Sequence, residues 1–100
     1  MNDVELILDA DQQGRFVITE GGEQLGEMEI KIKDAVLTAI HTEVAEAAEG
    51  KGLGKKLFSA MVDYARQNKL SVYPLCPFVH SQLKRHAADY ADIWTKGNEG

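Results

Sequence analysis

The chain is poor in the features of exported and membrane proteins. It has one cysteine, Cys76, so it cannot form an internal disulfide, which fits a reducing cytoplasm. No apolar run approaches the ~18–20 residues of a membrane span. Acidic residues stand near the start where a signal peptide is basic, so we expect no export signal. With two prolines and 44% hydrophobic residues in 100, we expect one compact domain.

Basic residues are scarce in the first half of the chain. Residues 1–49 hold three basic and twelve acidic residues, a net charge of −9, whereas residues 50–100 hold eight and four, a net charge of +4. The overall charge of −5 argues against nucleic acid, whose binding needs clustered Lys and Arg. The acidic residues either lie on solvated strand faces or form the negative part of a surface that has separate negative and positive regions. In the second case an anionic ligand favours the second half and a cationic one the first.

Alternating polar and apolar residues predict strands along the first 44 residues. Met28, Ile30 and Ile32 alternate with charged residues, as in a strand with one wet face. Gly21-Gly22 predicts a tight hairpin, and Lys33-Asp34 a further turn. These signals favour an antiparallel meander of four strands, expected at Val4–Leu8, Arg15–Thr19, Leu25–Lys33 and residues 35–44.

After these strands the apolar residues recur at helical spacing. One apolar stripe predicts a helix from about Gly52 to Gln67. A fifth strand, Leu70–Tyr73, is expected parallel to the fourth, because a right-handed crossover joins them. A second helix is expected from Pro77 and a short helical piece from Ala87. The pattern predicts an α+β domain over residues 1–96 and a frayed tail over 97–100.

A glycine-rich loop precedes the long helix in the segment EGKGLGKKL, residues 49–57. Helix N-termini present unpaired N–H groups and a partial positive charge, and glycines let a phosphate approach the backbone. The spacing is not that of a P-loop, and four antiparallel strands before it disfavour a dinucleotide fold. The loop therefore indicates either a pyrophosphate site or a solvated turn with lysines. Its glycines and cations are Gly50, Gly52, Gly54, Lys51, Lys55 and Lys56.

Three stretches carry a family resemblance: HTEV, VAEAAEGKGLGKKL and PLCPFV, at residues 41–44, 44–57 and 74–79. The second resembles the acetyl-CoA motif V-x-P-x-x-[RQ]-x-x-G-x-[GA] of the GNAT superfamily of N-acetyltransferases, with Val44, Gly52 and Gly54 matching. Glu46 replaces the usual proline and Glu49 the usual Arg or Gln, and an acid beside a pyrophosphate is unfavourable. Together the stretches resemble the minimal, stand-alone GNAT-like acetyltransferases of about this length.

The resemblance implies a GNAT-like fold. Four mostly antiparallel strands precede a crossover helix, a fifth strand parallel to the fourth, and one or two short C-terminal helices. The fourth and fifth strands would splay apart, with pantetheine along the fourth strand and the pyrophosphate on the glycine loop. The cofactor is implied to be acetyl-CoA, held by Glu43, Val44, Ala45, Gly50, Lys51, Gly52, Leu53, Gly54 and Lys55.

Cys76 is the first candidate catalytic residue. Pro77 follows it, and proline favours the first helical position, so the cysteine is expected at a helix N-cap. Helix N-termini lower the pKa of thiols below the usual ~8.5, and a thiolate can accept an acetyl group. The other interpretation is a small buried hydrophobic residue, as free cysteines often are.

His41 is the second candidate, expected beside the thioester. It is either a general base or a histidine that holds the sheet. Strand alternation places Glu43 on the same face, so the two form either a catalytic or a structural pair. His80 is expected in solvent and His86 near a helix end. The histidines and Cys76 lack metal-ligand spacing, so no metal is predicted.

The leading functional interpretation is an acyltransferase that moves acetyl from acetyl-CoA to an unidentified amine, on a small molecule or a protein. The alternative is an acyl-CoA-binding module without significant turnover, which Glu49 favours. A cysteine hydrolase lacks a convincing base and orienting group. We expect a cytoplasmic protein without nucleic acid or membrane partners. The acceptor, the route through Cys76 and the oligomeric state stay open, with a monomer slightly favoured.

Overall fold

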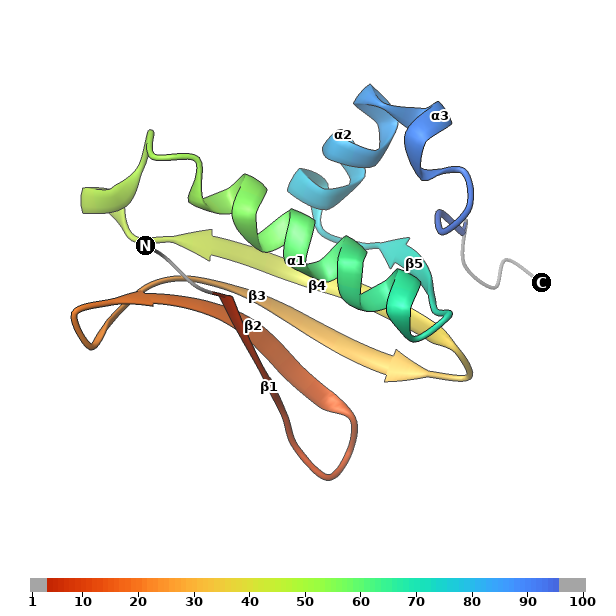
Figure 1. The fold of residues 1–100 in the computed structure, drawn as a ribbon, viewed down its shortest axis with the longest axis horizontal. Helices are drawn as coiled ribbons and strands as arrows, with labels where there is room; N and C mark the ends of the chain where they lie inside the picture. The colour runs from red at the N-terminus through yellow and green to blue at the C-terminus, as the bar shows by residue number, and fades with distance from the viewer. Residues whose placement is uncertain (1–3, 96–100) are drawn as a thin grey trace.

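A computed structural model describes residues 4–95, which form one mixed five-stranded sheet with its helices on one side (Figure 1). The strand order is β1-β2-β3-β4-β5, with β1–β4 antiparallel and β5 parallel to β4. The predicted meander and parallel fifth strand are therefore confirmed. The strands are β1 (Val4–Leu8), β2 (Gln13–Glu20), β3 (Glu23–Lys33), β4 (Val36–Val44) and β5 (Ser71–Pro74).

Two turns set the register of the central strands. Gly21 and Gly22, between β2 and β3, both have positive φ (59° and 83°), the conformation that a two-residue hairpin needs. Between β3 and β4 the residues with positive φ are Asp34 and Ala35, at 51° and 65°. The turn lies one residue later than Lys33-Asp34 predicts, and it holds an alanine in a conformation that favours glycine.

The long helix α1 (Leu53–Gln67) covers one face of the sheet, here called the inner face. Its predicted apolar stripe is buried against inward side chains of β2, β3 and β4. Each fully buried side chain of this size stabilises the fold by roughly 1.5–3 kcal/mol. The buried residues of the helix are Leu53, Leu57, Phe58, Met61, Val62 and Ala65, and those of the three strands include Phe16, Ile18, Met28, Ile30, Leu37 and Ala39.

Helix α2 (Pro77–Arg85) begins at the predicted proline and packs on the same face, and α3 (Ala87–Tyr90) follows it. The chain then runs back beside β5: the Val72 N–H donates to the Ile93 carbonyl at 2.6 Å. The tail therefore packs back along the edge of the sheet. The expected domain end at residue 96 and the frayed tail 97–100 lie outside the described residues.

The opposite face of the sheet, here called the open face, carries no helix within residues 4–95 (Figure 1). One element was not predicted. A 3-10 helix, η1 (Glu46–Ala48), links β4 to the glycine loop, and the side chain of Ala48 is buried beneath it. Strand β4 and η1 together carry the chain from the sheet to the N-terminus of α1.

Candidate active site

A β-bulge interrupts the pairing of β4 with β3. Glu29 lies opposite His41, and Ile30 lies opposite Ala39, so Ile40 has no partner on β3. When one strand of a pair has an extra residue, that strand bends at the bulge and the local twist increases. Because side chains alternate with a period of two, an extra residue also exchanges the faces of all residues that follow it.

The bulge therefore decides which side chains of β4 reach the inner face. Ala39 and Thr42 both lie opposite buried residues of β3 and face α1, although they are three positions apart. His41 and Glu43 face the open side, with 55% and 71% of their side chains exposed. The sequence pattern did not reveal this exchange, because Ile40 fits either face.

Strands β4 and β5 separate just after the bulge. Their pairing runs from Val36 and Ser71 to Ala39 and Pro74. The Ala39 carbonyl then accepts the N–H groups of Leu75 and Cys76, at 3.0 and 2.9 Å, and the chain turns away into α2. The predicted splay between the two strands is present.

The later part of β4 presents backbone groups to this splay. The Ala45 N–H donates to the Leu25 carbonyl of β3 at 2.7 Å. Antiparallel ladders alternate bonded and non-bonded pairs, so the N–H and C=O groups of Val44 and Thr42 point away from β3. Within residues 4–95 they have no backbone partner on that side.

The glycine loop forms the N-terminus of α1. Gly50 and Gly52 have positive φ, 88° and 73°, and Gly52 is the N-cap. The first turn of α1 has no acidic residue, and the N–H groups of Leu53, Gly54 and Lys55 have no intrahelical partner. The next N–H group, that of Lys56, donates to the Gly52 carbonyl at 3.2 Å. The Leu53 side chain is buried, so Leu53 offers a ligand its backbone only.

A groove of about 330 Å³ lies between the glycine loop, the end of β4 and the first turn of α2. Val44 and Phe78 line it from β4 and α2, and the loop from Ala48 to Lys55 forms its floor. Gly54 permits this closeness, because a Cβ there would lie 3.1 Å from the Phe78 ring. The lysines of the loop are exposed and, among the described residues, form no ion pair, as expected for cations available to an anion.

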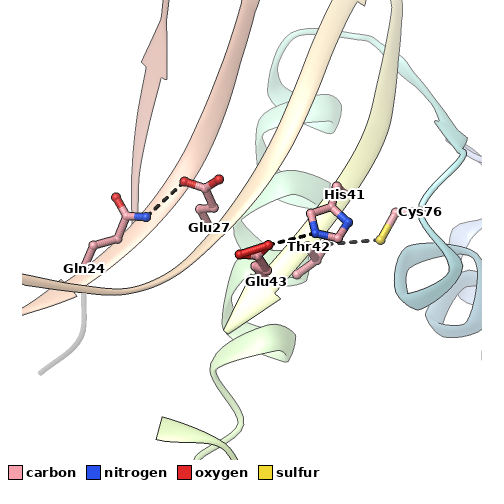
Figure 2. A network of polar contacts seen from close by, with 6 residues as sticks. All are labelled: Gln24, Glu27, His41, Thr42, Glu43 and Cys76. Atoms are coloured by element: carbon pink, nitrogen blue, oxygen red, sulfur yellow. Dashed lines mark hydrogen bonds and ion pairs between the residues drawn. The ribbon is translucent and has the colours of Figure 1, made fainter. Parts of the chain in front are cut away.

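The two candidate catalytic residues contact different side chains of β4 (Figure 2). His41 Nε2 is 3.1 Å from Glu43 Oε1 on the open face, so the predicted pair exists. Cys76 is the N-cap of α2, as predicted, and is 2% exposed on the inner side. Its thiol donates to Thr42 Oγ1 at 3.3 Å.

Three features of this site were not expected from the sequence: the bulge at Ile40, Thr42 at the thiol and Phe78 over the loop. Thr42 lies inside the HTEV stretch, and its position between two polar outward residues was the available signal. Phe78 is a partly buried aromatic residue directly after Pro77. In the sequence it looks like any apolar residue in the first turn of a helix. The exposed His80 and the helix-end His86 lie where predicted.

Some functional classes receive no support from the geometry. Among residues 4–95 no group of three or more His, Cys, Asp or Glu side chains is arranged to hold a metal ion. In the same part of the chain, no helix combines the length and hydropathy needed to cross a membrane. What the fold does define is a sheet opened beside a glycine-rich helix N-terminus.

Comparison with known proteins identifies the family. Residues 15–93 match the model of the GCN5-related N-acetyl-transferases, and the chain belongs to this family. A GCN5-like protein of Staphylococcus aureus, solved by NMR, is 27% identical, with 95% of this chain and 91% of that chain covered and a TM-score of 0.68. No curated protein matches the chain in sequence.

More distant structures share the fold. An IAA acetyltransferase of Bacillus cereus is 20% identical over 74% of this chain and 65% of that chain, with a TM-score of 0.63. The ribosomal-protein-S18-alanine N-acetyltransferase of Escherichia coli is 15% identical, with a TM-score of 0.62. The match covers 66% of this chain but only 43% of that enzyme. Members of the family generally use acetyl-CoA, and the groove, the uncapped N–H groups and the exposed lysines suit such a ligand.

Proposed function

We propose that this chain transfers the acetyl group of acetyl-CoA to an amine. The observation that carries the proposal is the continuity of three features: the open backbone edge of β4, the groove beside Phe78 and the glycine-rich N-terminus of α1. A phosphate group suits the helix N-terminus, and an extended amide chain suits the free strand edge.

The cofactor-binding residues divide by the groups that they offer. Gly50, Gly52, Leu53 and Gly54 offer backbone N–H groups, and Lys51 and Lys55 add positive charge. On β4 the free backbone groups belong to Val44 and Thr42, whereas Glu43 and Ala45 flank them. We therefore place pantetheine along Val44 and Thr42, within the expected stretch around residues 43–45.

In the reaction, the amine nitrogen attacks the thioester carbonyl, a C–N bond forms, the C–S bond breaks and the amine loses a proton. His41, oriented by Glu43, is the proposed base on the open face. Glu29 lies directly opposite His41 and adds negative charge, which favours a cationic amine. Cys76 is proposed on the other side, beside the departing thiolate.

This arrangement favours direct attack over a covalent relay. His41 faces the open side of the sheet, whereas Cys76, at the N-cap of α2, is buried on the inner side, so His41 is not placed to take the proton of Cys76. A nucleophilic cysteine ordinarily needs such a neighbouring base or another source of activation, and the N-terminus of α2 is the one that Cys76 has. We therefore propose that Cys76 protonates or stabilises the leaving thiolate.

Acetyl-CoA with a panel of primary amines, polyamines and lysine peptides tests the function, with CoA and acetylated amine measured by mass spectrometry. Stoichiometric release of both supports the acetyltransferase. Binding of CoA without either product supports the alternative, an acyl-CoA-binding module. Intact-mass analysis with acetyl-CoA alone decides the route: an acetyl group on Cys76 that the amine then removes would contradict direct attack.

A further inference from the structure

Thr42 lies between the two proposed residues of the open face, yet its side chain points the other way. The bulge at Ile40 produces this orientation, because a regular strand would direct His41 toward the inner face and Thr42 outward. The sequence HTE is thus divided across the sheet. The side chains of His41 and Glu43 lie on the open face, whereas the hydroxyl of Thr42 contacts Cys76.

The backbone of Cys76 is anchored on both sides. Its N–H donates to the Ala39 carbonyl at 2.9 Å, and its own carbonyl accepts the His80 N–H at 2.9 Å. An N-cap side chain commonly bonds to the N–H groups of its own helix. Here the thiol makes no such bond and is directed across the splay to β4 instead.

The charged and titratable side chains on the surrounding elements make no hydrogen bond to the Cys76 thiol. His41 and Glu43 of β4 face the open side, Tyr73 belongs to β5, and His80 of α2 lies against the Trp94 ring. Among the described residues, Thr42 supplies the only side-chain hydrogen bond to the sulfur.

We infer that Thr42 is the positioning residue of the Cys76 thiol in the acetyl transfer proposed above. A hydroxyl both accepts and donates hydrogen bonds. Thr42 accepts the S–H bond while Cys76 is a thiol, and its own O–H can turn to donate to the sulfur once the thiol has given its proton to the departing CoA sulfur. After CoA leaves, the thiolate regains a proton from water and His41 releases to water the proton taken from the amine. Since Thr42 also presents its backbone to the splay, the same residue aligns the thiol with the bound thioester.

Vibrational spectroscopy tests the contact independently of activity. Cys76 is the only cysteine, so the protein has a single S–H stretching band. Thr42→Val keeps the shape of the side chain but removes the hydroxyl, and we expect the band to move to higher frequency. Thr42→Ser keeps the hydroxyl and should restore the wild-type frequency. An unmoved band in Thr42→Val would overturn the inference.

Kinetics test the positioning role. We expect Thr42→Val to lower kcat roughly tenfold, equivalent to about 1.4 kcal/mol and to the scale of one hydrogen bond, without weakening CoA binding. Thr42→Ser should recover most of this loss. Equal kcat in all three proteins, or an equal loss in both variants, would overturn the inference. If the wild-type protein binds CoA but acetylates no amine, the proposed function fails, and the band still decides whether Thr42 holds the thiol.

Discussion

His41 and Glu43 contact each other where water reaches both side chains. An exposed pair of this kind stabilises a fold by only ~0–1 kcal/mol. The pair therefore contributes little to the stability of the fold, since neither side chain fills the core. The exposure on the open face instead leaves the imidazole accessible to an incoming amine.

Replacement of His41 separates the catalytic role from the structural one. We expect His41→Ala to lower kcat by about 10²- to 10⁴-fold, the usual contribution of a general base. The melting temperature and the affinity for CoA should stay at wild-type values, as measured by thermal unfolding and calorimetry. His86→Ala, at the exposed end of α2, is the matched control and should be fully active. A lower melting temperature with unchanged kcat would assign His41 to the fold.

Gly54 is needed for packing as much as for access to a ligand. Its missing Cβ faces the Phe78 ring at 3.1 Å, whereas a Cβ at Gly52 would meet nothing within 4 Å. We expect Gly54→Val to displace Phe78 and to destabilise the protein by about 1–3 kcal/mol, the usual effect of overpacking. Urea unfolding measures this effect.

A second substitution makes the test of Gly54 specific. The pair Gly54→Val with Phe78→Leu should regain stability relative to the sum of the single changes, because the smaller side chain relieves the contact. Additive effects of the two changes would show that Phe78 is not the neighbour that matters.

At the scale of the element, the turn between β3 and β4 contains avoidable strain. Ala35 has φ 65°, where an L-residue with a Cβ is disfavoured. Ala35→Gly should therefore raise the free energy of unfolding by about 1 kcal/mol, measured in urea. Ala10→Gly, in the turn after β1 and without a positive φ, is the control and should lower it by about 0.4–1 kcal/mol. Loss of stability in Ala35→Gly would contradict the argument.

The elements were more predictable than their faces. Local periodicity and glycines predicted β1 with its observed bounds, the hairpin at Gly21-Gly22 and the start of α2 at Pro77. The bulge at Ile40 depends on pairing with β3, which local sequence does not encode. For this reason the pattern could place His41 and Glu43 on one face but could not tell which face it was, and Thr42 escaped notice.

At the scale of the whole molecule, an ion pair links the described part of the returning tail to α1. Arg66 donates from Nε to Asp92 at 3.0 Å, and its side chain also donates to the Asp89 carbonyl at 2.7 Å. The hydrogen bond from Arg66 lowers the pKa of the Asp92 carboxyl, although burial opposes this shift. Because of this lowered pKa, the stability that the ion pair gives to the packing of the tail depends on pH.

The sign of this link gives a pH prediction. A carboxyl with a depressed folded-state pKa stabilises the fold above its unfolded pKa, near ~3.9 for aspartate. That stability is lost as the pH falls through the lower folded value. Asp92→Asn should therefore be less stable than wild type at pH 7, with the difference shrinking toward pH 2 in urea titrations. Asp11→Asn, in the exposed β1–β2 turn, is the control. A difference that does not change with pH would reject the link.

The acidic and basic side chains of the chain gather in two different regions. The open face shows acids such as Glu29 and Glu43, while the glycine loop shows exposed lysines. A cationic amine and an anionic cofactor would thus approach opposite sides of β4. Glu49 departs from this division, because it is an exposed acid beside the loop at the C-terminal end of η1.

Two measurements test the role of charge at the loop. The affinity for CoA should fall as salt rises, because the Debye length shortens from ~30 Å at 0.01 M to ~8 Å at 0.15 M. Glu49→Gln should tighten binding roughly two- to fivefold at low salt, the effect of removing one partly screened charge of about 0.5–1 kcal/mol. Asp34→Asn, in the β3–β4 turn at the opposite end of β4, changes the net charge equally and should have a smaller effect. If the two variants bind CoA with equal affinity, Glu49 does not face the pyrophosphate, and if salt has no effect, the lysines do not contribute through their charge.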